Sequence, residues 1–273
     1  QILMTEIAVP LTVRRTVALS RAVYEGRAQV EEMKGVLVKD QAGAEKVMAD
    51  GDIAVMVDEK AACCEWFRPD VIVDAILAKK NLGTKITDAP FVIGVGPGFT
   101  AGTDCNCVVE TKRGHTLGNI IWRGEAIPNT GVPGNVAGYT IERLIRAEAD
   151  GILKPKAKIG DHVEKGSVVA VTGGVPVYAQ MTGIVRGMLQ SGVQVSKNLK
   201  IGDIDARAEI SHCYTISDKA RAIGGGVLEA VMGFERMKDE FAIVILAAGA
   251  GTRSGGNKLN ALVRNKPLYK HTL

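Results

Sequence analysis

Apolar and helix-like segments alternate along the first part of the chain, up to about Asp88. Short β-branched runs at 36–38, 53–57 and 71–74 have the pattern of buried strands, whereas 16–24 and 42–48 have the period of amphipathic helices. Strands that are separated by helical periods normally pair in parallel. The pattern therefore predicts an α/β fold, a Rossmann-like parallel sheet with crossover helices. The first strand and glycine turn of such a fold are missing, which we attribute to a cut N-terminus.

From Pro90 to about Tyr139 the pattern changes to strands punctuated by glycine. Apolar runs at 91–95, 107–109 and 120–122 predict strands, and turn-forming residues fill 128–134. We expect a helix over 139–147 to close this section.

Residues 151–204 consist of short apolar runs with turn signals between them. The string Gly160-Asp-His-Val-Glu-Lys-Gly166 is echoed by Gly192-Val-Gln-Val-Ser-Lys197, which resembles the two halves of a biotinyl or lipoyl barrel-sandwich module. The usual modifiable lysine of the central hairpin is missing, because that stretch reads Gly174-Val-Pro-Val-Tyr-Ala-Gln-Met181. We therefore expect a small β-barrel inserted into the α/β domain, without a swinging arm.

Composition narrows the class of protein. The 273 residues are 46% hydrophobic and 23% charged, with a net charge of +4 spread along the chain. This balance gives no footprint for nucleic acid or an anionic membrane. The 32 glycines favour a small-molecule site made of backbone, and a small anion is the expected partner. No apolar run approaches the ~18 residues that a membrane span needs. Five cysteines form an odd set without a secretory segment, so we expect a cytoplasmic protein without a disulfide framework.

A glycine-rich loop from Gly94 to Cys105 follows a predicted strand. Its backbone N–H groups could wrap an anionic ligand, with Gly96, Gly98 and Gly102 as the candidates. An equally good interpretation is a tight turn that the fold itself requires.

Cysteines provide the candidate nucleophiles. Cys105, beside Asp104, and Cys107 have the spacing that puts both thiols on one face of a strand, which suits soft-ligand or chalcogen chemistry. Small buried hydrophobic residues are the alternative, and a metal site, which usually needs four donors, is not expected. Cys213 follows His212, and a nearby imidazolium can lower a thiol pKa, although neighbours on a strand point to opposite faces.

Basic side chains occur next to two predicted turns. Lys219 lies at the start of a predicted helix that Ser217 can cap, so its role is either ligand contact or part of the helix start. Lys112, Arg113 and His115 could contact phosphate, or form a solvated turn.

The C-terminal segment carries the most specific motif. An apolar run at 242–246 enters a loop of small residues in which Gly249, Gly251, Arg253 and Lys258 could hold phosphates. Together with Lys266-Pro-Leu268 it resembles the start of MobA/MocA-type nucleotidyltransferases, which implies CTP or GTP with Mg. Few residues follow, so the acidic metal ligands of that family are absent from this chain.

These patterns predict four sections. They are an α/β domain at 1–150, a barrel insert at 151–204, a return to the α/β domain at 205–236, and a truncated nucleotidyltransferase start at 237–273.

Longer strings point to one family. They resemble the YqeB-type accessory proteins of selenium-dependent molybdenum hydroxylases, and they lie at 14–26, 68–81, 94–105, 128–131, 201–205 and 215–226. The resemblance implies a maturation role, with the hydroxylase apo-enzyme as partner and a selenium species or a molybdopterin-type cofactor as ligand. In this interpretation Cys105 carries selenium or sulfur, with Cys213 near it. Two alternatives are nucleotidyl transfer to molybdopterin and a non-catalytic scaffold that docks the hydroxylase.

Overall fold

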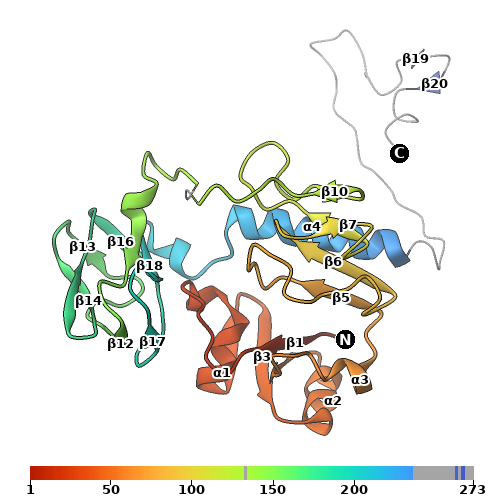
Figure 1. Cartoon of the computed structure of the whole chain (residues 1–273), viewed down its shortest axis with the longest axis horizontal. Coiled ribbons are helices and arrows are strands. Elements are labelled where there is room, and N and C mark those ends of the chain that lie inside the picture. Colours follow the sequence, from red (N-terminus) through yellow and green to blue (C-terminus); the bar gives the residue numbers. More distant parts are fainter. Residues whose placement is uncertain (132–133, 236–261, 264–265, 268–273) are drawn as a thin grey trace. The chain divides into compact units, whose positions relative to one another are not determined.

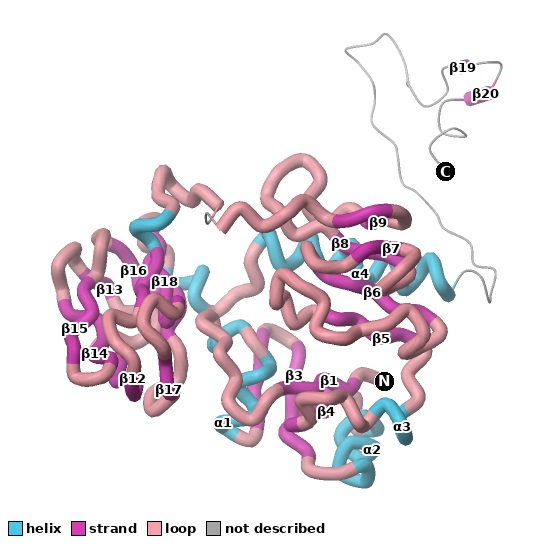
Figure 2. Tube along the Cα trace, in the orientation of Figure 1, coloured by secondary structure: helices cyan, strands magenta, loops and turns pink. Residues whose placement is uncertain are grey.

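The structure is a computed structural model that describes residues 1–131, 134–235, 262–263 and 266–267. Residues 1–232 form one compact unit, and residues 233–273 are assigned to a second. The first unit contains four sheets of four strands each: two are built from successive segments of the chain, and the other two share interleaved strands of one segment (Figures 1 and 2).

The first sheet comes from the N-terminal quarter of the chain. Its strands, in spatial order, are β1 (Leu3–Glu6), β4 (Ile53–Val57), β3 (Met33–Val38) and β2 (Arg27–Val30). β1 and β3 pair in parallel with β4, and β2 adds an antiparallel edge. Helix α2 (Gln41–Ala49) connects β3 to β4, and the Asp40 carboxylate caps it by accepting a 2.8 Å hydrogen bond from the Gly43 amide.

Short helical turns surround this sheet. They are the 3-10 turns η1 (Arg15–Val17) and η2 (Leu19–Arg21) and the one-turn helices α1 (Ala22–Glu25) and α3 (Cys64–Phe67). The amphipathic period at 16–24 therefore becomes two 3-10 turns and one short helix. Leu19 packs against Gly35 of β3, where an added Cβ would lie 3.2 Å from the leucine side chain. The apolar residues at 16–24, whose spacing predicts one longer helix, therefore pack on the sheet from three short turns.

The second sheet positions the candidate site. Its strands, in spatial order, are β5 (Val71–Asp74), β6 (Phe91–Val95), β8 (Cys107–Val109) and β9 (Ile120–Ile121). The first three are parallel to one another, and β9 is antiparallel to β8. A small hairpin-like pair of β7 (Thr100–Ala101) and β10 (Gly124–Glu125) lies beside it. β6 and β8 are buried along their whole length, as the apolar runs predict.

Helix α4 (Asp218–Glu235) returns to this sheet and contains three successive glycines. At Gly226 an added Cβ would overlap the carbonyl oxygen of Gly118, and at Gly118 one would lie 2.5 Å from the carbonyl oxygen of Ala222. The helix and the loop before β9 therefore approach backbone to backbone, which only glycine permits. Figure 1 shows α4, in blue, running alongside β6.

Residues 144–205 form two antiparallel sheets around one apolar core. The first contains β11 (Leu144–Arg146), β18 (Lys200–Asp205), β16 (Gly183–Met188) and β13 (His162–Val163). The second contains β15 (Val175–Tyr178), β14 (Val168–Thr172), β12 (Gly151–Pro155) and β17 (Gln194–Val195). Leu153, Val185 and Ile201 are fully buried between them. Figure 2 shows these strands together, apart from β1–β9.

The predicted fold class, a Rossmann-like parallel sheet with an inserted β-barrel, is wrong. Among the named strands of the described residues, parallel pairs occur only inside two separate sheets, and each of these sheets ends in an antiparallel edge strand. The strands of 144–205 lie in two open sheets, each with free edges, and not in a closed barrel. β-branched runs predict that a strand forms, but the partner and direction of each strand depend on packing across the whole domain.

The expected helix at 139–147 is also absent. The structure places the 3-10 turn η3 (Ile141–Arg143) there, and it runs directly into β11. Pairing of β11 with β18 satisfies the backbone groups that a helix would have paired internally. The section boundaries at 150, 204 and 236 stay a prediction, and 237–261 lies outside the described residues.

Candidate functional site

Three parallel strands end at one edge of the second sheet, and the residues that follow them form the candidate site. β5 ends at Asp74, β6 leads into Gly96, and β8 leads into Glu110 and Thr111. In open sheets, ligands bind outside the carboxyl ends of parallel strands, where loops diverge. We call these residues, together with the start of α4, the carboxyl edge.

The glycine loop is held at this edge by close backbone contacts. The Gly96 amide donates a 2.9 Å hydrogen bond to the carbonyl of Val109. Gly98 has a φ of +112°, and an added Cβ there would lie 2.5 Å from the Cα of Lys80. The Asn81 amide donates a 3.1 Å hydrogen bond to the Gly98 carbonyl. The close contacts show that Gly96 and Gly98 are required by the tight turn itself. Because the turn lies beside the strand ends, it can also bind a ligand there.

Asp74 organises the loop that follows β5. Its carboxylate is 7% exposed and accepts hydrogen bonds from the Ile76 amide at 3.1 Å and the Thr84 hydroxyl at 2.6 Å. The backbone of Leu77 and Lys79 lies in the left-handed region, with φ values of 60° and 66°. This tight path brings the loop against Gly98.

Glu110 is a buried carboxylate at the end of β8. One oxygen accepts from the amides of Thr111 and Lys112, both at 2.7 Å, and the other accepts from the Ile127 amide at 2.8 Å. Its oxygens therefore have backbone partners, and it fixes the turn that carries Arg113.

Lys79 and Arg113 act electrostatically on Lys219 at the carboxyl edge. Lys219, on the first turn of α4, is partly buried, and burial followed by the nearby charges of Lys79 and Arg113 lowers its pKa. Arg113 makes a bidentate contact with Asp218, with hydrogen bonds of 2.6 and 2.8 Å. Asp74, Glu110 and Asp218 are the carboxylates of the edge, so the formal charges of these residues balance. The preference for an anion therefore rests on the partly buried Lys219 at the amino end of an 18-residue helix.

Ser217, the residue before α4, caps this helix. The Ser217 hydroxyl accepts a 3.2 Å hydrogen bond from the Ala220 amide. Ser217, and not Lys219, therefore caps the helix. The Lys219 side chain is within electrostatic range of Lys79 and Arg113.

Asp104 and Cys105 lie at the end of the glycine loop, where they make the contacts of a turn residue and a core residue. The Asp104 carboxylate accepts a 2.8 Å hydrogen bond from the Thr100 amide, which closes the turn after β7. Cys105 is 0% exposed in a core cluster with Val92 and Phe99. Burial raises the pKa of the Cys105 thiol, against a smaller opposing hydrogen bond from the Gly94 backbone. Gly102 has a φ of +87° and completes this turn.

The two cysteines predicted to form one thiol site contact different elements. Cys213 lies in η4 (Ile210–Cys213), and its thiol donates to the carbonyl of Val185 on β16 at 3.8 Å. Burial raises its pKa also, with Arg186 acting in the opposite direction. Neither geometry nor charge supports a shared thiol site with Cys105. The catalytic role of both cysteines and of Asp104 stays a prediction.

Cys107 fits a packing role. Cys107 is fully buried on β8, and burial raises the pKa of its thiol to about 12. Among the described residues, no cluster of three or more histidine, cysteine or acidic side chains could hold a metal ion. No helix in the described ranges has the length and apolar character needed to cross a membrane.

The phosphate loop predicted in the C-terminal segment, with Gly249, Gly251, Arg253 and Lys258, lies outside the described residues. Only the short pair β19 (Leu262–Val263) and β20 (Lys266–Pro267) is described in that segment.

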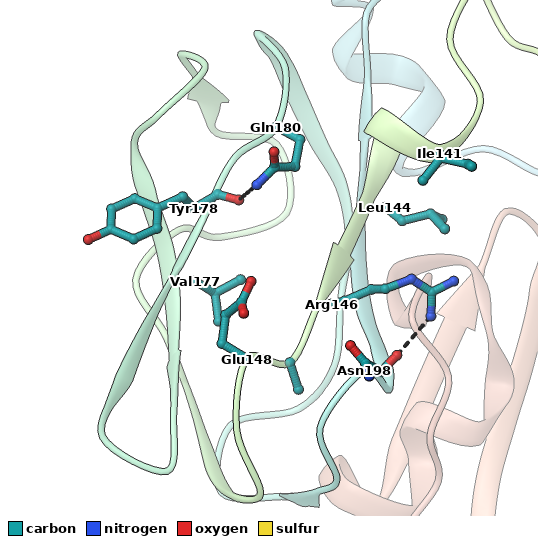
Figure 3. A pocket seen from close by; sticks show the side chains of 9 residues that line it. Ile141, Leu144, Arg146, Glu148, Val177, Tyr178, Gln180 and Asn198 are labelled. Carbon is teal, nitrogen blue, oxygen red and sulfur yellow. Dashed lines mark hydrogen bonds between the residues drawn. The ribbon is translucent and has the colours of Figure 1, made fainter.

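Two hollows lie away from all the predicted site residues. One, of about 300 Å³, opens between β11 and β15, and Figure 3 shows Arg146 and Glu148 at its rim. Arg146 donates a 2.8 Å hydrogen bond to the Asn198 carbonyl. The other, of about 520 Å³, is lined by Leu11, Gln194 and Leu199, among others. Both are open surface hollows lined by polar and apolar side chains. The lining of neither contains a cysteine nucleophile or a cluster of cations.

Sequence reasoning missed Lys79 and Asp74 as members of the carboxyl edge. Their string, 68–81, stands out in the sequence only through its family resemblance. A usable signal exists, because an acidic residue at the end of a predicted strand, with paired lysines five residues later, marks a strand end with a basic loop.

Comparison with known proteins gives one relative by sequence. No known protein-family profile matches the chain. The chain is 49% identical over 232 residues to "Uncharacterized protein YqeB" of Escherichia coli K12. This match covers 85% of the chain and 43% of the relative, so the chain spans less than half the length of the curated protein it matches.

Solved structures give only distant likenesses. An aspartoacylase family protein from Mesorhizobium loti matches with 22% identity over 23% of this chain and 22% of its own, at a TM-score of 0.22. A succinylglutamate desuccinylase/aspartoacylase from Rhodobacter sphaeroides matches with 17% identity over 42% of this chain and 45% of its own, at a TM-score of 0.23. Scores this low transfer neither a fold nor an activity. What the comparisons establish is sequence kinship: this chain is a relative of YqeB, similar to it over a segment that makes up 43% of that protein.

Proposed function

We propose that this chain is an accessory protein in the maturation of selenium-dependent molybdenum hydroxylases, and that it binds a cofactor-related anion at the carboxyl edge. The observation that carries the anion site is the partly buried Lys219, on which the charges of Lys79 and Arg113 act, in an edge where the Lys80 backbone packs against Gly98. The maturation role rests on the family resemblance of the sequence strings, to which the kinship with YqeB adds support.

Charge and burial favour the anion. A partly buried ammonium group with a lowered pKa, flanked by two like charges, gains from a counter-ion because the anion restores the solvation that burial removed. The amide dipoles at the start of α4 act in the same direction. An anionic group of a molybdopterin-type cofactor fits this donor set, since its oxygens would accept from Lys219 and Arg113.

The thiols fit a direct selenium-carrying role less well. A thiolate is the form that attacks or binds a chalcogen, and burial holds Cys105 and Cys213 as protonated thiols. The proposal therefore includes anion binding and contains no thiol step.

Binding by the full chain tests the anion site. Isothermal titration calorimetry with orthophosphate, molybdate and selenite as probes should show weaker binding for Lys219→Gln, by about tenfold for a lost charged contact. Lys46→Gln, an exposed lysine on α2, is the matched control and should bind as the parent protein does. Equal affinity of the Lys219 variant and the parent for all three probes would overturn the site.

Maturation is tested in cells. A strain that lacks the gene, carrying a selenium-dependent molybdenum hydroxylase, should recover hydroxylase activity with the parent chain and lose it with Lys219→Gln. Full activity in the deletion strain would exclude the maturation role and leave the anion site standing.

Nucleotidyl transfer and hydroxylase docking remain the alternative predictions. The first depends on Gly249 to Lys258, outside the described residues, and no contact in the described residues favours the second.

A further inference from the structure

A second group of charges, on β18 and its neighbours, shares no residue with the carboxyl edge. Asp203 and Asp205 are 0% and 1% exposed and, two residues apart on one strand, point to the same face. Arg14 donates a 2.6 Å hydrogen bond to Asp203, and Arg143 lies 3.5 Å from the same carboxylate. Segments from distant parts of the described chain therefore converge on this face.

Asp205 is paired in the same way. Arg186 on β16 lies 3.1 Å from its carboxylate, and Arg207 lies 2.6 Å from it. We call Arg14, Arg143, Arg186 and Arg207 the arginine cluster.

Positive charge exceeds negative charge in this group. In the ion pairs of the described residues two carboxylates face four guanidinium groups, and the exposed carboxylate of Asp218 acts on Arg207 in addition. The side chains of Arg143 and Arg186 are each 7% exposed, so little of their charge is solvated by water. Burial lowers the pKa values of both, and the charge of Arg14 adds to the effect. Buried charge in surplus is costly unless a counter-ion offsets it.

Two buried nitrogen atoms beside this surplus have no hydrogen-bond partner in the described part of the chain. They are Nε of Arg143 and Nδ1 of His212. His212 adjoins the cluster, because its carbonyl accepts a 3.0 Å hydrogen bond from Nε of Arg186. Buried polar atoms in folded proteins normally have a partner, so orphaned atoms beside surplus charge indicate a group that binds there.

Two members of the arginine cluster reach solvent. The side chains of Arg14 and Arg207 are 31% and 40% exposed, in contrast to the other two. Guanidinium groups present paired N–H donors, a geometry that matches oxyanions with several oxygens.

We propose that the arginine cluster binds a phosphate-type oxyanion that enters past Arg14 and Arg207. The site shares no residue with the carboxyl edge, but the two are electrostatically coupled, because the charge of Arg14 acts on Lys219 and that of Arg207 acts on Asp218. The ligand is either free phosphate or the phosphate group of a larger molecule.

Titration of the full chain with orthophosphate and, separately, with glycerol phosphate tests the proposal and separates the two sources. Arg207→Gln should lower phosphate affinity by about tenfold, and Arg14→Lys, which keeps the charge but loses the paired donors, should lower it also. Arg146→Gln, on β11 but bonded to the Asn198 carbonyl, is the matched control. Tighter binding of glycerol phosphate than of orthophosphate would identify a phosphate monoester as the ligand.

The two sites are distinguished by combining variants. Lys219→Gln should leave the binding that Arg207→Gln removes, and the double variant should lose both. If both arginine variants, folded by circular dichroism, bind phosphate as Arg146→Gln does, the arginine cluster is not a binding site. Phosphate binding that disappears only in Lys219→Gln would likewise exclude the arginine cluster and leave the carboxyl edge intact.

Discussion

The guanidinium of Arg14 donates a 2.6 Å hydrogen bond to the carboxylate of Asp203, which is fully buried on β18. The neighbouring residue extends this contact, because the Val13 carbonyl accepts a 2.8 Å hydrogen bond from the Met188 amide on β16. An added Cβ at Gly187 would lie 2.6 Å from the Val13 side chain, so the N-terminal segment packs directly on the antiparallel sheet. The ion pair thus joins segments that are 189 positions apart in sequence.

Asp203→Asn should destabilise the protein by about 3–5 kcal/mol at pH 7, because it leaves the guanidinium groups of Arg14 and Arg143 without their buried counter-charge. The paired arginine holds the pKa of Asp203 below its ordinary value, despite burial. The carboxylate therefore stabilises the fold fully above its unfolded pKa of about 3.9, and this contribution is lost as the pH falls through the lower folded pKa. Urea unfolding from pH 7 to pH 2 measures both effects.

Asp218→Asn is the control, because its contact with Arg113 is exposed and should change stability by at most about 1 kcal/mol. A difference between parent and Asp203→Asn that stays constant down to pH 2 would contradict the assigned ion pair.

Gly226→Ala should destabilise the fold by about 1–3 kcal/mol, because the new methyl group overlaps the Gly118 carbonyl where α4 crosses the loop before β9. Gly225→Ala is matched in sequence and helix position but meets no atom within 4 Å. It should be neutral or stabilise by up to about 1 kcal/mol, as alanine favours helix. Thermal unfolding distinguishes the two, and equal effects would argue against the close approach.

Alkylation should separate the cysteines by burial. Cys64, which is only partly buried, should react first with iodoacetamide at pH 8. Cys105, Cys107 and Cys213 are buried with raised pKa values, so each should react only when urea unfolds the chain. Mass spectrometry of tryptic peptides measures the order. Rapid labelling of Cys105 in the native protein would restore the thiol step that we leave out of the proposed function.

Gly98→Ala should weaken anion binding and stability more than Gly102→Ala does. Both glycines have positive φ, of +112° and +87°, so both substitutions carry backbone strain of about 1–2 kcal/mol. Only at Gly98 does the added Cβ also clash with backbone, that of Lys80, which must then move. Calorimetry with orthophosphate and urea unfolding measure the two effects. Gly102→Ala with the larger loss of binding would place the site at the other end of the loop.

Local pattern was sufficient for many strands. The apolar runs at 36–38, 53–57, 71–74 and 91–95 each appear within a strand of the structure, and Ser217 accepts a hydrogen bond at the start of α4 as its sequence position indicates. These features depend on residues next to each other in the chain. β-branched side chains favour extended backbone, and a hydroxyl before a helix reaches the free amides of its first turn.

Strand partners and directions depended on the tertiary structure. The same apolar runs are compatible with one parallel sheet or with the two mixed sheets that form, because side-chain alternation does not encode the neighbour. The segment 139–147 shows the same limit, since pairing with β18 overrides its helical period. The burial of the thiols also depends on tertiary packing. Cys105 is buried because Val92 and Phe99 pack around it, and the sequence near Cys105 does not encode that contact.

The sequence shows which lysines and arginines lie beside turns, but not which of them lie close together in the folded protein. A lysine and an arginine beside turns are ordinary surface residues until folding brings Lys79, Arg113 and Lys219 to one edge, or Arg14 to Asp203. Contacts across more than a hundred residues leave no local signature, because the free energy that favours them comes from burial and charge pairing in the folded state alone. The sequence by itself determined where strands and turns form and which residue types were available; the tertiary structure decided which of them share a site.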